Sequence, residues 1–175
     1  MISDLMDAIR IQSGRLQFEF ENRDLREIVT ESVDLWKNIS AKHEIIMTLP
    51  KEPIIVRCDI DRIAQVLNNL LSNAIKYSPG GGAILVSASI DPNGTANLAI
   101  TDHGIGVPPS EAKQIFRPFH RTSLAHIEKI PGVGIGLSVS KKIIEAHGGS
   151  ISLETTIGLG STFRIQLSTA TIQVA

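Results

Sequence analysis

Asparagine and lysine side chains recur on one side of the stretch 61–77. Asn69, Asn73 and Lys76 are spaced four and three residues apart, so in an α-helix they share a polar arc opposite the apolar positions. An asparagine carbonyl oxygen is a neutral, hard ligand suited to Mg²⁺, and a lysine ammonium can reach a phosphate. The spacing therefore indicates a site for a phosphorylated ligand and its metal ion, with an ordinary solvated helix face as the alternative.

Glycine-rich segments follow further along the chain. In Asp102-His103-Gly104-Ile105-Gly106 a carboxylate at a strand end precedes two glycines, which lets a ligand lie close to the backbone. The segment Gly132-Val133-Gly134-Ile135-Gly136-Leu137 opens a predicted helix, whose first N–H groups can bind phosphate. It is not a Walker A loop, since no Gly-Lys-Ser/Thr follows, and not a dinucleotide fingerprint, since Leu137 replaces the last glycine. Each segment alone is also explained as a structural turn.

The composition argues against several classes of protein. A formal net charge of −1 and an aromatic content of 4% do not suit a domain that binds nucleic acid. The single cysteine, Cys58, can form neither an internal disulfide nor a metal cluster, and we expect it in a strand in a reducing compartment. No apolar run approaches the ~20 residues of a membrane span, and the first residues are not a signal peptide. We expect a cytoplasmic domain, with a membrane anchor in a longer parent protein left open.

Hydrophobic periodicity predicts the elements that position these residues. We expect residues 1–22 to be the end of a helix, and residues 103–135 to be a long lid rich in Gly and Pro. The remaining elements are helices over 24–39, 61–77 and 136–147, a short helix near 110–116, strands over 44–49, 53–58, 84–90 and 98–100, and a final hairpin over 151–154 and 162–167. Because no βαβ regularity is present, this order predicts an α+β fold. We expect a two-layer α/β sandwich with a mixed, mostly antiparallel sheet, helices on one face and a long lid.

Taken together, the motifs resemble the N, G1, F, G2 and G3 boxes of sensor histidine kinases, over about residues 24–168. In the same order, the matching segments are 69–77, Asp102-x-Gly-x-Gly, 115–121, Gly-x-Gly-x-Gly-Leu at 132–137, and 158–163. The resemblance implies the ATP-binding sandwich shared with type II topoisomerases, mismatch-repair ATPases and a heat-shock chaperone. It also implies three parts: 1–22 as the end of a dimerisation and phosphoacceptor helix or a linker, 23–170 as the catalytic ATP-binding domain, and 171–175 as a tail.

The resemblance implies a role for each site residue. Asn73 would hold Mg²⁺, with Asn69 supporting it, and Asp102 would accept a hydrogen bond from the adenine amino group. Arg121 would stabilise charge on the transferred phosphoryl group. Phe116 and Phe119 would pack the lid. The cofactor-binding set is Asn69, Asn73, Lys76, Tyr77, Asp102, Gly104, Gly106, Gly132, Gly134, Gly136, Leu137 and Thr162, and the catalytic set is Asn69, Lys76 and Arg121. Within the cofactor-binding set, Gly104 and Gly106 would let the adenine base enter, and Thr162 would lie near the base.

The implied activity is that of a protein-histidine kinase. It would transfer the γ-phosphoryl group of ATP, with Mg²⁺, to a histidine on a separate dimerisation domain absent from this chain. None of the five histidines present fits the family's His-Glu-x-x-x-Pro box, so we expect no self-phosphorylation. The implied partners are that phosphoacceptor domain and the receiver domain of a response regulator. We expect the parent protein to be a homodimer and this chain to be a monomer.

Alternatives stay open at this point. ATP-hydrolysing members of the same fold carry a glutamate one turn before the magnesium asparagine, where this chain has Asn69, a poor base. A serine-directed kinase and a degenerate module that binds partners without ATP are the others. This sequence also departs from the family at Val133, where Thr or Ser is common, at His103, where Asn or Thr is common, and at His120, where Tyr is common.

Overall fold

One mixed sheet forms the base of the molecule. A computed structural model describes residues 6, 16–37, 39 and 41–170. In that part of the chain the sheet contains β2 (His43–Thr48), β4 (Gly82–Ile90), β5 (Thr95–Asp102), β7 (Gly160–Ser168) and β6 (Ser150–Thr156), in that spatial order. β2 runs parallel to β4, and the other neighbouring pairs are antiparallel. The predicted mixed, mostly antiparallel sheet is confirmed.

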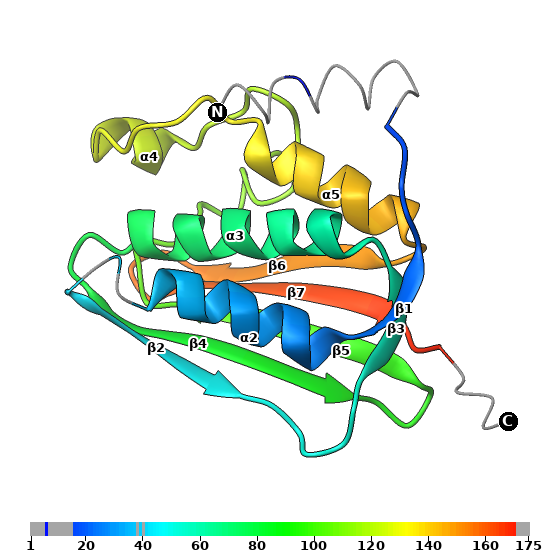
Figure 1. Cartoon of the computed structure of the whole chain (residues 1–175). Coiled ribbons are helices and arrows are strands. Elements are labelled where there is room, and N and C mark those ends of the chain that lie inside the picture. The colour runs from blue at the N-terminus through cyan, green and yellow to red at the C-terminus, as the bar shows by residue number, and fades with distance from the viewer. Residues whose placement is uncertain (1–5, 7–15, 38, 40, 171–175) are drawn as a thin grey trace, which may run out of the picture.

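A layer of helices covers one face of this sheet (Figure 1). It consists of α2 (Leu25–Trp36), α3 (Ile60–Lys76) and α5 (Gly136–Ala146). The central helix α3 packs against α2, α5 and β5. Side chains along β5 and β7 alternate between buried and more exposed, as expected when one face packs and the other meets solvent. The predicted two-layer α+β sandwich is confirmed.

Helix α3 is the element that the site depends on most. The side chain of Asp59 caps it by accepting a hydrogen bond from the N–H of Arg62 at 3.1 Å. Its apolar positions are buried against the sheet and the neighbouring helices: Ile63, Val66, Leu67, Leu70, Leu71 and Ala74. This packing turns the opposite, polar arc toward the segment that precedes α5, as the sequence predicts.

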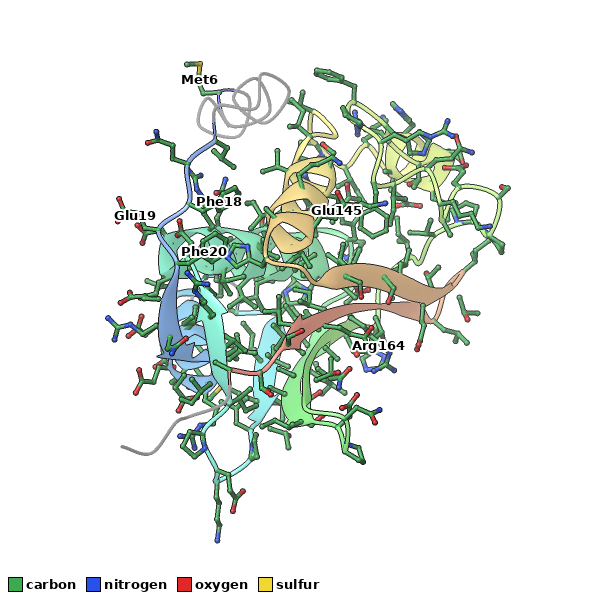
Figure 2. The ribbon with its side chains drawn as sticks, turned by 90° about the vertical axis from the view of Figure 1, so that its right-hand side faces the viewer. Met6, Phe18, Glu19, Phe20, Glu145 and Arg164 are labelled. Carbon is green, nitrogen blue, oxygen red and sulfur yellow. The ribbon has the colours of Figure 1, made fainter. Side chains whose placement is uncertain are left out.

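The segment before α2 differs from the prediction. Residues 16–20 are extended, and β1 (Glu21–Asp24) pairs antiparallel with β3 (Ile55–Cys58), so the predicted helix is wrong over 16–22. Figure 2 shows Phe18 and Phe20 on the side of the segment that faces the helices. The alternation of apolar and polar residues here has the period of a strand, and that pattern explains the result. Met6 is helical, and the rest of the predicted helix lies outside the described residues.

The lid also differs in detail. Residues 108–117 form successive turns in place of the predicted helix near 110–116, with the carbonyl oxygen of Pro108 accepting from both Glu111 and Ala112. The helix of the lid is α4 (Ser123–Ile127), whose start is capped by Thr122. Helix α2 ends at Trp36, three residues earlier than expected. In the described part of the chain, no helix has the length and apolar character that a bilayer-spanning segment needs.

Candidate active site

A cavity of about 290 Å³ opens between α3, the end of β5 and the lid segment before α5. It brings together most of the residues predicted from the sequence. Those that line it are Asn69, Asn73, Lys76, Tyr77, Asp102, Gly106, Arg121, Gly132, Gly134, Gly136 and Leu137. Gly104 and Thr162 do not line it. Motifs separated by more than 60 residues in sequence therefore meet at one site.

Asp102 forms one wall of the cavity. It is the last residue of β5 and is only 5% exposed. The backbone N–H of Gly104 donates to its Oδ1 at 2.9 Å. Burial raises the pKa of the Asp102 carboxyl, while backbone N–H groups of Gly104 and Ser161 oppose that rise. A carboxylate has capacity for further hydrogen bonds, so Asp102 can accept one from a donor inside the cavity.

The glycines after Asp102 are required by close packing of the backbone. A Cβ on Gly104 would lie 2.0 Å from the carbonyl oxygen of Tyr77. Gly106 has φ of +69°, and a Cβ there would lie 2.3 Å from the carbonyl oxygen of Thr156. The N–H of Ile105 donates to the carbonyl oxygen of Tyr77 at 3.0 Å. These contacts hold the loop against α3 and β6. Close packing is therefore a structural reason for glycine at these positions, in addition to the expected access for the base.

Positive charge gathers at the lid side of the cavity. Burial and, to a lesser extent, the charge of Arg121 lower the pKa of the Lys76 ammonium. Its Nζ lies 5.5 Å from the centre of the Tyr77 ring, and a Cβ on Gly132 would approach it to 2.9 Å. Asp102 is the one carboxylate among the described residues that line the cavity. A site that holds two cations and a single carboxylate favours an anionic ligand.

Asn69 has a packing role in addition to its place at the cavity. Its Nδ2 donates to Oγ of Ser140 on α5 at 2.9 Å. A Cβ on Gly136 would lie 2.3 Å from Asn69 Oδ1, so only glycine allows this approach of the two helices. Asn73 lies one turn further along α3 and also lines the cavity. Its amide oxygen is the donor type that the sequence predicts for Mg²⁺.

Helix α5 begins without a side-chain cap. Its N-cap residue is Ile135, which makes no capping hydrogen bond in the described structure. The first N–H groups of a helix have no partner within the helix and attract anions. The glycines and Leu137 at this end line the cavity, so the start of α5 lies where the sequence predicts a phosphate contact.

Thr162, which was expected near the base, lies elsewhere. Thr162 hydrogen-bonds through Oγ1 to Oγ1 of Thr101 at 2.9 Å, and its neighbour Ser161 lines the cavity instead. Residues on one strand alternate between faces, so the inward Phe163 places Ser161 inward and Thr162 outward. The sequence reading missed Ser161, although the alternation predicted for 162–167 contains that signal.

The two lid phenylalanines behave differently. Phe116 packs edge-on against Phe163 with ring centroids 6.5 Å apart, which agrees with its predicted packing role. Phe119 is 63% exposed, so the expectation that it packs the lid is wrong. Its backbone has φ of 63°, and its N–H donates to the carbonyl oxygen of Gly134 at 2.8 Å. The left-handed backbone turns the ring of Phe119 outward while the peptide joins two parts of the lid.

Known proteins share this architecture. The chain is 34% identical over 171 residues to the sensor histidine kinase WalK of Bacillus subtilis (strain 168), which covers 95% of this chain and 28% of WalK. The structure of the mycobacterial sensor histidine kinase MprB has 30% identity and a TM-score of 0.74, covering 87% of this chain and 100% of that chain. The structure of the Acinetobacter baumannii histidine kinase AdeS has 27% identity and a TM-score of 0.77. The match covers 97% of this chain and 77% of that chain.

The match is to a domain and not to a whole kinase, since the chain spans 28% of the length of WalK. The resemblance to sensor histidine kinases that the sequence motifs indicate is confirmed. The family described as histidine kinase-, DNA gyrase B- and HSP90-like ATPase matches residues 58–171, which hold all the candidate site residues. The chain therefore belongs to this family of ATPases.

Proposed function

We propose that this chain is the ATP-binding catalytic domain of a sensor histidine kinase, which transfers the γ-phosphoryl group of ATP to a histidine on a separate dimerisation domain. The observation that carries the proposal is one cavity with a buried carboxylate, Asp102, and two cations, Lys76 and Arg121. The carboxylate suits the amino group of adenine, and the cations suit the phosphates. The domain binds ATP as a member of its family.

Asp102 selects the base in this proposal. Its carboxylate accepts from the exocyclic amine of adenine, whereas guanine presents a carbonyl oxygen at that edge. Two facing acceptors would leave a buried charged group unpaired, which costs about 1–3 kcal/mol. The hydrogen bond from Gly104 holds the carboxylate in place before the ligand arrives.

Asn73 suits Mg²⁺ through the type of donor that it offers. The described residues contain no group of three or more His, Cys, Asp or Glu side chains that would hold a metal ion. Phosphate oxygens and water would supply the remaining ligands, as is usual for Mg²⁺ in nucleotide sites. The ion would offset the negative charge of the phosphates when bound. Lys76 and Arg121 would stabilise the charge that develops on the transferred group, and positioning would supply most of the catalysis.

Transfer to histidine is favoured over hydrolysis by the chemistry of Asn69. Its amide is no base, and its Nδ2 is engaged by Ser140. A neutral imidazole is already nucleophilic near neutral pH, so a domain that phosphorylates histidine needs no strong base of its own. The proposed partners are the dimerisation domain that carries this histidine and the receiver domain of a response regulator, in a homodimeric parent protein. We infer a cytoplasmic location, where ATP is available.

Labelling with γ-³²P ATP tests the proposal. The chain alone should stay unlabelled, and addition of the parent protein's dimerisation domain should give acid-labile, alkali-stable label on that domain. Asp102→Asn, which alters the carboxylate without removing volume, should reduce that labelling. Label on the chain itself, or acid-stable label on serine, would reject the transfer to a separate histidine.

A further inference from the structure

Buried polar atoms without partners point to a contact beyond those already assigned. Among the described residues, the buried side-chain N and O atoms that lack a hydrogen bond are Ser78 Oγ and His120 Nε2. Such atoms nearly always have partners in folded proteins, and an exception calls for a functional reason. The Ser78 hydroxyl lies close enough to Asp102 to lower the pKa of that carboxyl, and His120 lines the cavity. Both therefore belong to the surroundings of the same site.

The backbone around His120 is held in place. The N–H of His120 donates to the carbonyl oxygen of Arg117 at 3.2 Å. Its own carbonyl oxygen is crowded by Gly134, where a Cβ would approach it to 2.5 Å and where φ is +78°. The N–H of Phe119 bonds to the carbonyl oxygen of Gly134 at 2.8 Å. The backbone that carries the imidazole is thus fixed, while Nε2 has no partner among the residues that the structure describes.

The charges near His120 favour an anionic partner for it. Lys76 and Arg121 line the same cavity, and Arg121 follows His120 directly in sequence. The nearby carboxylate, Glu111, is engaged by the N–H and Oγ of Ser123 at 2.9 and 2.6 Å. Those hydrogen bonds hold the pKa of Glu111 below its usual value, with smaller contributions from the charges of His120 and His126. Glu111 therefore does not satisfy Nε2, whereas a phosphate oxygen in the cavity would.

We propose that His120 is a further nucleotide-binding residue, whose Nε2–H donates a hydrogen bond to a phosphate oxygen of the bound nucleotide. The inference rests on the proposed binding of ATP and adds a third donor to Lys76 and Arg121. Neutral imidazole with its proton on Nε2 and imidazolium both supply this donor. The contact would also link the lid to the ligand, because the backbone of His120 packs on Gly134.

Replacement of His120 by phenylalanine separates this role from a structural one. Phenylalanine keeps the ring and removes the buried nitrogen. We expect the affinity for ATP with Mg²⁺ to fall on the order of tenfold or more, as for loss of a hydrogen bond to a charged group. The affinity for adenosine, which lacks phosphates, should not change. The melting temperature without nucleotide should stay the same or rise, since an unpaired buried atom is removed.

Two further variants complete the experiment, with affinities measured by calorimetry and by competition for adenosine. His120→Gln, which offers an amide donor, should recover part of the ATP affinity. The matched control is His126→Phe, since His126 is an exposed lid histidine that does not line the cavity. It should bind ATP as the wild type does. If the phenylalanine variant does not fold, the ratio of ATP to adenosine affinity in His120→Ala provides the same comparison.

The results that would reject the role of His120 differ from those that would reject ATP binding. Unchanged ATP affinity in His120→Phe, or an equal loss of affinity for adenosine, would overturn the role of His120. Each of those results leaves ATP binding by the wild type in place. Failure of the wild type to bind ATP would instead overturn the proposed function itself, so the two failures are distinguishable.

Discussion

Removal of the His147 side chain should destabilise the domain at a point far from the cavity lining. His147 follows α5, and its Nε2 accepts a hydrogen bond from the backbone N–H of Asp59 at 3.0 Å. Its Nδ1 donates to the carbonyl oxygen of Ile143 at 2.7 Å. The ring also packs against Phe18 and Phe20, with centroids 5.5 and 4.9 Å away. His147 thereby joins the end of α5, the start of α3 and the segment that leads into β1.

The expected loss follows from these contacts. His147→Ala leaves the buried N–H of Asp59 without its acceptor, which costs about 1–3 kcal/mol. Loss of the ring contacts adds about 0.5–1.5 kcal/mol for each aromatic pair. The free energy of unfolding should fall by about 2–6 kcal/mol, a large share of the roughly 5–15 kcal/mol of a typical domain. With a urea m-value of about 1–3 kcal/mol/M, the unfolding midpoint should fall by about 1 M or more.

The same interaction predicts a pH dependence of stability. Burial lowers the pKa of His147 below its ordinary value of 6.5, while the hydrogen bond to the carbonyl oxygen of Ile143 and the charge of Asp59 oppose that fall. The unfolded chain therefore takes up this proton more readily than the folded one. The stabilisation is present above pH 6.5 and is lost as the pH falls from there through the lower pKa of the folded state.

Urea denaturation of the wild type and His147→Ala near pH 7.5 and near pH 5.5 measures both effects. The difference in unfolding free energy between the two proteins should be larger at the higher pH. Contributions from other titrating groups, including the raised pKa of Asp102, cancel in this comparison. A difference that is the same at both pH values, or that is smaller than about 0.5 kcal/mol, would refute the assigned hydrogen bonds.

Four further predictions concern the cavity. The wild type should bind ATP more tightly than GTP in calorimetry, because Asp102 is a buried acceptor; equal affinities would contradict its assigned role. Asn73→Ala should remove the effect of Mg²⁺ on nucleotide binding without lowering the melting temperature of the free protein, and an undiminished effect would place the metal elsewhere. Gly136→Ala should destabilise the free protein by about 1–3 kcal/mol, measured by thermal melting, because the added Cβ would lie 2.3 Å from Asn69 Oδ1; wild-type melting would refute this clash. Amide hydrogen exchange over 117–135 should slow when ATP is added, and equal protection in both states would argue against a lid.

Local patterns were readable from the sequence where one segment carried the whole signal. Helix α3 is predicted almost to its ends because its cap, its apolar stripe and its polar arc all lie within 59–77. The same kind of pattern was present but misread at 16–20, where alternation indicates an extended segment. Ser161 was missed for a similar reason, since its inward orientation follows from the alternation of β7. These errors concern signals that the sequence contains.

The role of particular glycines was only partly accessible from the sequence. The pattern after Asp102 indicates a tight loop, but the demand for glycine at 104 comes from the carbonyl oxygen of Tyr77. The demand at Gly136 comes from Asn69, on another helix. Such contacts join residues that are far apart along the chain, and no spacing within one motif reveals them.

The amino-acid sequence by itself thus determined the class of fold, the motifs and the chemical types of the site residues, because periodicity and residue chemistry are local properties. Only the tertiary structure decided which of these residues share one cavity and which do not. It placed Ser161 inside and Thr162 outside, and it left Nε2 of His120 buried at a cavity that two cations also line. Burial, hydrogen-bond satisfaction and charge proximity depend on neighbours from distant segments, so they arise only when the sheet and helices have packed together.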